Sequence, residues 1–297
     1  MSSASRWPKV DRFLISTLAA YALLAAVFHS RVKGWRTLVL EAAGAIALLL
    51  ALQPLCRRIA ARRPRCLLRF SSLVMVLIFV YEASIRLTFI LSPGWRDDAV
   101  VKFETSLLGV QPAVWLQRFL SPGLTEWFMF SYLLYFLLYP VCVTAFCLKG
   151  GEALAEDLLW VVGVNNVLCN FGYLLFPVSD PVSRFGAGSF VPFKGFVFTP
   201  AGEFLRAHLM TTGGGMPSGH AAAVTIMALM AYRYHRRLSY VLIPAAVSIW
   251  IATVYCRFHY LSDTVMGILV AVLWWGALTA VYPRLRRARV RPADASP

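Results

Sequence analysis

Eight apolar runs, each close to the length needed to cross a bilayer, dominate this sequence. A transmembrane helix needs about 20 apolar residues, and lipid-exposed backbone has to satisfy its own hydrogen bonds. The sequence therefore predicts an all-α, polytopic membrane helix bundle of about eight transmembrane helices. They are expected at 13–28, 37–55, 67–91, 124–148, 156–176, 217–234, 240–256 and 261–282.

The first run could also be the core of a signal peptide. We favour a retained span, because further spans follow and no small-x-small cleavage site is evident. Only 14% of the 297 residues are charged, whereas a soluble protein carries about 25%. The net charge of +15 does not indicate nucleic-acid binding, because the basic residues cluster between the apolar runs, as expected beside a membrane.

Charge also predicts the orientation and the division of the chain. With eight spans and a cytoplasmic N-terminus, eighteen Lys and Arg residues fall on the cytoplasmic side and ten on the other. We expect two N-terminal spans and a basic loop at 1–66, a six-span catalytic core at 67–283, and a basic cytoplasmic tail at 284–297. No Asn-x-Ser/Thr sequon is present, which favours a bacterial inner membrane with a periplasmic site.

The first candidate functional stretch is 213–220, Gly-Gly-Gly-Met-Pro-Ser-Gly-His. A glycine-rich turn that leads into a helix directs backbone N–H groups and the positive helix end at one point, which favours an anion such as phosphate. Ser218 and Gly219 would supply donors, and His220 a proton. Taken alone, the stretch could equally be a capped helix start.

The second candidate stretch precedes the last span. His259 and Asp263 are four residues apart, so on a helix Asp263 can orient one ring nitrogen and leave the other as a nucleophile. Arg257 adds a planar fork suited to phosphate oxygens. A structural pair at a helix end is the alternative. Because the predicted topology places both stretches on one side, they predict phosphoryl transfer through a phosphohistidine, with no cofactor and no metal ion required.

Two further polar features stand out. The long loop 177–215 carries Asp180, Arg184, Lys194 and Arg206, and we expect it to select the lipid, with Asp180 and Lys194 near its head group. Glu82 and Arg86 lie four apart within a span, which favours a structural ion pair; lining of a head-group cavity is the alternative.

The order Pro-Ser-Gly-His (217–220) followed by His-x-x-x-Asp (259–263) resembles the phosphatidic acid phosphatase type 2 superfamily. The form His-Tyr-x-x-Asp-x-x-x-Gly (259–267) is similar to the inositol phosphorylceramide synthase (aureobasidin-target-like) branch, as are Leu-Gly-Val-Gln-Pro (108–112) and Phe-Pro (176–177). The resemblance covers roughly 67–282. It implies that His259 is the nucleophile, Asp263 its orienting partner and His220 the acid/base, with Ser218 and Gly219 binding phosphate.

The chain departs from this pattern at its arginines. The superfamily places an arginine six residues before the nucleophilic histidine, where this chain has Thr253, and its Lys and Arg-Pro motif has no clean match. The nearest candidate for that motif ends at Arg184. Arg184 and Arg257 are therefore the predicted phosphate clamp.

We accordingly expect a metal-independent membrane lipid phosphatase or phosphotransferase. The alternatives are a phospholipid head-group transferase, in which an alcohol replaces water as acceptor, and an inactive lipid transporter or flippase. Candidate substrates are phosphatidic acid, isoprenyl phosphates or pyrophosphates, phosphosphingolipids and phosphoinositides.

Overall fold

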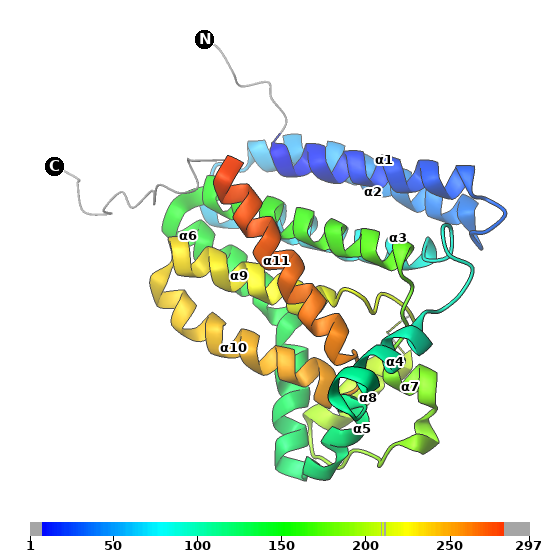
Figure 1. Cartoon of the computed structure of the whole chain (residues 1–297). Helices are drawn as coiled ribbons and strands as arrows, with labels where there is room; N and C mark the ends of the chain where they lie inside the picture. The colour runs from blue at the N-terminus through cyan, green and yellow to red at the C-terminus, as the bar shows by residue number, and fades with distance from the viewer. Residues whose placement is uncertain (1–7, 209, 211, 282–297) are drawn as a thin grey trace.

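The computed structural model describes residues 8–208, 210 and 212–281, and all regular structure in these residues is helical (Figure 1). The predicted all-α bundle is confirmed, and each predicted apolar run lies mainly on a helix; the third, predicted to reach residue 91, leaves the helix after Arg86. The long helices are α1 (Lys9–Val27), α2 (Trp35–Arg58), α3 (Arg62–Arg86), α6 (Pro122–Leu175), α9 (Gly219–Tyr234), α10 (Arg236–Tyr255) and α11 (Leu261–Val281).

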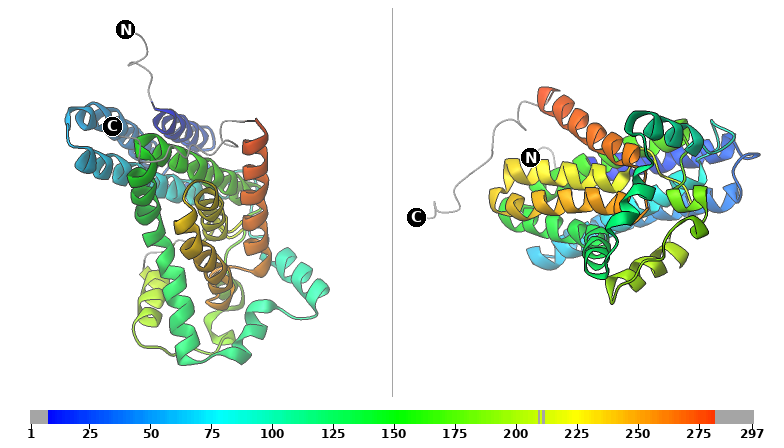
Figure 2. Two further views of the ribbon diagram at one scale, coloured as in Figure 1. Left: turned by 90° about the vertical axis from the view of Figure 1, so that its left-hand side faces the viewer. Right: turned by 60° about the horizontal axis from the view of Figure 1, so that its bottom comes forward.

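Six helices of the described residues are long and apolar enough to cross a membrane, namely α1, α2, α3, α6, α10 and α11. The 54-residue α6 contains two of the predicted spans. It is broken at Gly151, whose φ of 80° suits glycine, and its halves point in different directions (Figure 2). The six helices thus hold seven of the eight predicted runs.

The eighth run corresponds to α9, which has 16 residues and is about 24 Å long. It packs against α6, α10 and α11, and its residues from Ala221 to Ala228 are all buried. A helix that is apolar on every side is stable only when it is surrounded in this way. The short α9 therefore forms the centre of the bundle and brings its first turn to the end where the site lies.

The two N-terminal helices share this core. Leu14 of α1 and Leu38 of α2 belong to the same continuous apolar cluster as Val224 of α9. Asn170 of α6 also donates to the hydroxyl of Tyr21 on α1 at 3.1 Å. The division at residue 66 stays a prediction, and the basic tail at 284–297 lies outside the described residues.

Arg86 forms an ion pair with Glu41, and its predicted pairing with Glu82 stays a prediction. Arg86 Nη1 donates to Glu41 Oε2 on α2 at 2.5 Å, and Nη2 donates to the carbonyl of Gly34 at 3.1 Å. Arg86 is the last residue of α3, so its side chain reaches the neighbouring α1–α2 turn. The contact joins α3 to the N-terminal pair of helices.

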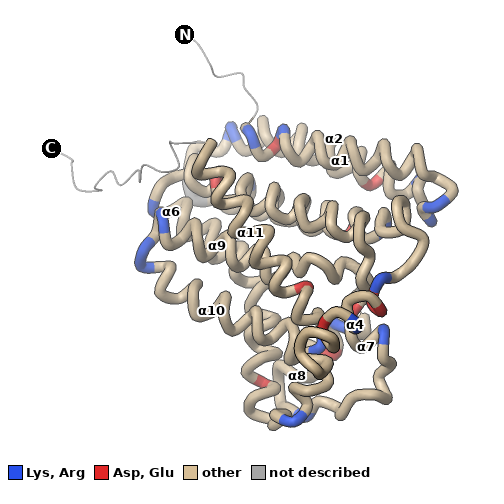
Figure 3. Tube along the Cα trace, in the orientation of Figure 1, with Lys and Arg blue, Asp and Glu red and all other residues tan. Residues whose placement is uncertain are grey.

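Short helices gather at one end of the bundle, beside the first turns of α9 and α11 (Figure 1). They are α4 (Asp97–Leu108), α5 (Pro112–Trp115), η1 (Leu116–Phe119), α7 (Pro181–Phe185), η2 (Ala187–Ser189) and α8 (Phe198–His208). The start of α1, the end of α11 and the basic α9–α10 turn lie at the opposite end (Figure 3). The long loop 177–215 is thus partly helical.

Candidate active site

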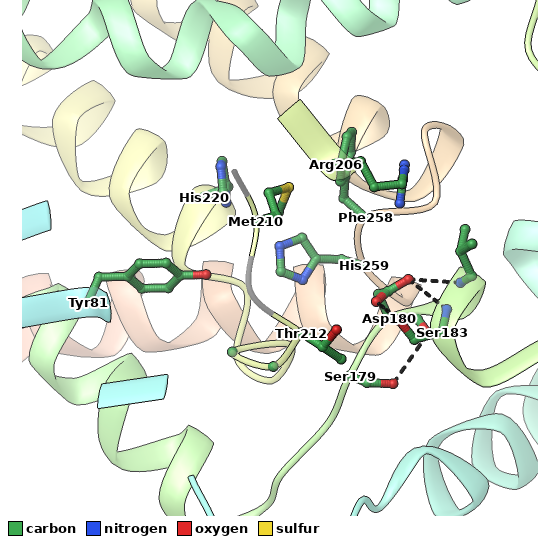
Figure 4. Close-up of a pocket in the computed structure, with 13 residues that line it drawn as sticks. Tyr81, Ser179, Asp180, Ser183, Arg206, Met210, Thr212, His220, Phe258 and His259 are labelled. Atoms are coloured by element: carbon green, nitrogen blue, oxygen red, sulfur yellow. Dashed lines mark hydrogen bonds between the residues drawn. The ribbon is translucent and has the colours of Figure 1, made fainter. Parts of the chain in front are cut away.

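The two predicted motifs meet at this end of the bundle. The amide of Ser218 donates to the carbonyl of Asp263 at 2.8 Å, which joins the start of α9 to the first turn of α11. The rings of His220 and His259 lie 5.8 Å apart between centroids. Both line one cavity of about 100 Å³, in which His259 lies among the labelled side chains (Figure 4).

His259 is held through one ring nitrogen. Its Nδ1 lies 3.1 Å from the carbonyl oxygen of Gly215 and 3.6 Å from Asp263 Oδ2. Both partners are acceptors, so in the neutral ring they favour the tautomer with the proton on Nδ1 and the lone pair on Nε2. The buried Asp263 accepts the amide of Tyr260 at 2.9 Å, which fixes the carboxylate at the helix start. Asp263 thus contacts His259 at ion-pair distance, with the main hydrogen bond going to Gly215.

His220 lies in the first turn of α9 against an aromatic wall from α6. Its ring stacks on Tyr132 at 4.6 Å and an interplanar angle of 22°, and it also packs on Tyr135 at 4.1 Å. Nε2 of His220 is buried and has no hydrogen-bond partner in the protein. A buried polar atom without a partner is costly, so this nitrogen is suited to a group that enters the cavity.

The glycine-rich turn adopts the strained backbone that its sequence predicts. Gly213 and Gly214 have φ of 126° and 69°. The hydroxyl of Ser218 accepts the amide of Ala221 at 3.3 Å and caps α9, and Gly219 packs against the hydroxyl of Tyr173. Neither Ser218 nor Gly219 is among the residues that line the cavity, whereas the turn itself contributes Thr212, Gly213 and Gly214.

The two arginines predicted as the phosphate clamp point elsewhere. Arg257 is buried; it donates to the carbonyl of Val191 at 2.9 Å and packs over the rings of Phe190 and Phe193 at 4.7 and 4.0 Å. Burial and the neighbouring Arg206 charge lower the pKa of Arg257 to about 10. Arg184 forms an ion pair with Asp98 on α4.

Arg206 of α8 is the arginine that lines the cavity with both histidines. Its guanidinium stacks on Phe258 at 3.9 Å and donates to the carbonyls of Cys256 and Arg257 at 2.5 and 3.3 Å. These contacts hold the planar guanidinium at the cavity that both histidines line, and a phosphate clamp would need such a group there. Sequence reasoning placed Arg206 in the functional loop but did not assign it this role.

Glu126 at the start of α6 fixes α8. Its carboxylate accepts four backbone amides where α8 begins, at 2.5 to 3.1 Å; they belong to Phe196, Val197, Phe198 and Thr199. A carboxylate at a helix N-terminus satisfies the unpaired amides and complements the helix dipole. Glu126 thereby determines where α8 presents Arg206.

Of the predicted head-group residues, Asp180 lines the cavity and Lys194 is exposed outside it. Asp180 Oδ1 accepts the amides of Val182 and Ser183 at 2.9 and 3.0 Å, which starts α7. Tyr81 of α3 also lines the cavity and was not predicted.

Residues 173–287 match the family model of the PAP2 superfamily. No curated protein and no solved structure matches the chain. The PAP2 match and the membrane-length helices support a superfamily of the membrane lipid phosphatase type. Members of the PAP2 superfamily are generally phosphatases or phosphotransferases. His220, His259, Asp263 and Arg206 lie inside the PAP2 segment, whereas Tyr132 and Glu126 precede it.

Helix α4, which also precedes the PAP2 segment, supports the turn that holds His259. Asp97 is buried; it accepts the hydroxyl of Ser179 at 2.7 Å and that of Tyr260 at 3.0 Å. Burial and the Asp97 charge raise the pKa of Tyr260, which keeps its phenol a donor. Two helical turns later, Glu104 accepts the amide and hydroxyl of Ser262 at 2.7 and 2.8 Å. The two carboxylates hold Tyr260 and Ser262, the residues on either side of Leu261, where α11 begins.

Gly267, within the PAP2 segment, allows α11 to approach α9. An alanine Cβ at this position would overlap the carbonyl oxygen of Ser218 and lie 3.2 Å from the amide of Ala222. Because both obstacles are backbone atoms, we expect Gly267→Ala to lower stability by about 1–3 kcal/mol and to reduce turnover. Gly276→Ala on the same helix is the matched control, because its Cβ meets nothing within 4 Å. Thermal unfolding in detergent and turnover measure the difference, and equal behaviour of the two variants would contradict it.

Proposed function

We propose that this protein is a membrane-embedded lipid phosphate phosphatase or phosphotransferase that works through a phosphohistidine. The observation that carries the proposal is the pairing of His259 with His220 across one cavity, their ring centroids 5.8 Å apart. Nδ1 of His259 is engaged by Gly215 and Asp263, which leaves Nε2 as the nucleophile. The PAP2 match supports the same class of activity.

In the first step, Nε2 of His259 attacks phosphorus and the bond from phosphorus to the lipid oxygen breaks. Protonated His220 gives its proton to the departing oxygen. In the second step, neutral His220 takes a proton from water or an alcohol, which attacks the phosphohistidine and releases phosphate or a new phosphoester. Arg206 and the turn at Thr212–Gly214 line the space that the phosphoryl oxygens would occupy. Phosphate binding by Ser218 and Gly219, and head-group selection by Asp180 and Lys194, remain predictions.

The proposed setting is a bacterial inner membrane with both termini cytoplasmic and the site at the periplasmic face. The excess of Lys and Arg on the predicted cytoplasmic side, eighteen against ten, supports this orientation. A lipid would then reach the cavity from the outer leaflet. The bilayer supplies the substrate, and an alcohol acceptor would be the second partner of a transferase.

A screen of lipid phosphates with purified protein, with and without EDTA, tests the proposal. Turnover of at least one candidate lipid that persists in EDTA is expected, because arginine and backbone donors hold the phosphate charge. A labelled phospholipid incubated with inositol or a glycosyl acceptor separates the two reactions: free phosphate indicates hydrolysis, and a labelled new ester indicates the synthase-like branch. Lipid movement across a reconstituted bilayer without any phosphoenzyme would instead favour the transporter.

A further inference from the structure

A second, larger hollow lies between α3 and the first half of α6. Its volume is about 710 Å³. None of the residues that line it carries a charge; they belong to 66–75 of α3 and 136–148 of α6 and include Val74, Phe136 and Thr144. This groove, called the α3–α6 groove below, is suited to a hydrocarbon occupant.

The faces of both helices that line the groove continue to the catalytic cavity. On α3, Tyr81 follows Val74 by seven residues, which is two helical turns along the same face, and Tyr81 lines the catalytic cavity. On α6, the ring of Phe136 packs edge-on against His220 at 5.9 Å between centroids. Tyr132, one turn earlier on α6, stacks on His220. One end of the groove, at Phe136, therefore lies against His220.

The catalytic cavity is polar and the adjoining α3–α6 groove is apolar, which matches the polar head group and apolar chain of a lipid phosphate. The cavity at the end of the bundle holds histidines and Arg206, and the groove that starts at Phe136 is apolar. Its α6 wall extends from Phe136 to Leu148, about 18 Å of helix. A head group at His259 would therefore direct its chain past His220 into the groove.

We propose that the α3–α6 groove binds the hydrocarbon chain of the lipid whose phosphate reacts at His259; this inference rests on the proposed function. In a membrane the chain is already in an apolar medium, so the groove contributes by close packing and alignment and gains little from removal of water. Chain binding fixes phosphorus in line with Nε2 of His259, and chain length therefore affects the reaction rate.

Groove-filling variants test the proposal. Thr144→Trp on α6 and Val74→Trp on α3 each place an indole in the groove from opposite walls, and Val141→Trp on the exposed, non-lining face of α6 is the matched control. For a lipid phosphate with C16 chains, kcat/KM should fall about tenfold or more in either groove variant. For a homologue with C4 chains, kcat/KM of the groove variants should stay within about twofold of the parent protein. With Val141→Trp, kcat/KM should stay within about twofold for both substrates. An equal loss for both chain lengths, or no loss for either, would overturn the proposal.

A crosslinking measurement does not depend on turnover. Phosphatidic acid with a diazirine at the chain end should label residues 66–75 and 136–148, and unlabelled phosphatidic acid should suppress the labelling. Phosphatidylcholine with the same chains should not compete. Labelling that both lipids suppress equally would mean that ordinary bilayer lipid fills the groove, and the inference would be wrong. If specific labelling occurs but no lipid phosphate is turned over, the groove is supported and the proposed reaction fails.

Discussion

Replacing His259 with alanine should abolish turnover of every lipid phosphate that the parent protein accepts. Nε2 of His259 is the proposed nucleophile, and His220, the other imidazole among the described residues that line the cavity, is assigned to proton transfer. We expect a loss of at least about three orders of magnitude in kcat. Initial rates measure this loss, and labelled substrate followed by an alkaline quench should trap phosphate on the parent protein but not on the variant.

His220→Ala separates the two proposed roles. For a lipid substrate, loss of the proton donor should lower kcat by about two to four orders of magnitude. An aryl phosphate has a leaving group that needs no proton, so His220→Ala should still form the phosphohistidine with it and then fail to release it. The variant should therefore accumulate labelled protein, whereas His259→Ala forms none.

His235→Ala is the control for both variants. His235 lies between α9 and α10 at the opposite end of α9 from His220, so its loss should leave the rate unchanged. Substantial activity in His259→Ala, or a phosphoenzyme in that variant, would exclude His259 as nucleophile.

The bundle could be predicted because its signal is local. Each long apolar run has to be helical in lipid, whatever its neighbours are. Seven of the predicted runs accordingly lie on the six long membrane-length helices, and the eighth lies on α9. The meeting of His220 with His259 followed from the same reasoning, since α9 runs away from the site and α10 returns to it. The two spans predicted at 124–148 and 156–176 already imply a break between them, and the structure places it at Gly151.

The arginines could not be assigned from sequence because their directions depend on distant partners. Arg184 is drawn to Asp98 on α4, and Arg257 packs between two phenylalanine rings. Arg206 reaches the cavity because Glu126, some 70 residues earlier in the chain, anchors the start of α8. One local signal was present: Thr199-Pro200 is a typical helix start, and it predicts a helix that ends near Arg206.

Arg206→Ala should lower kcat/KM by about two to three orders of magnitude, as expected when a preorganised donor to a phosphoryl group is removed. Arg206→Lys should recover little of this loss, because an ammonium cannot reproduce the planar fork or its stacking on Phe258. Arg184→Ala should change kcat/KM by no more than about twofold, because that exposed side chain pairs with Asp98 outside the cavity. Steady-state kinetics on one lipid phosphate compare the three variants.

Arg206 also supports the backbone at Cys256 and Arg257, so a structural loss has to be separated from a lost phosphate contact. Glu203→Gln is the variant to compare with Arg206→Ala. It removes the carboxylate charge 3.5 Å from Arg206 Nε while the guanidinium itself is kept. Added guanidinium should restore part of the activity of Arg206→Ala, because a free cation can occupy the vacated position against Phe258. If thermal unfolding shows that Arg206→Ala is folded, yet its rate is normal and Arg184→Ala is the impaired variant, then the clamp lies where the sequence pattern placed it.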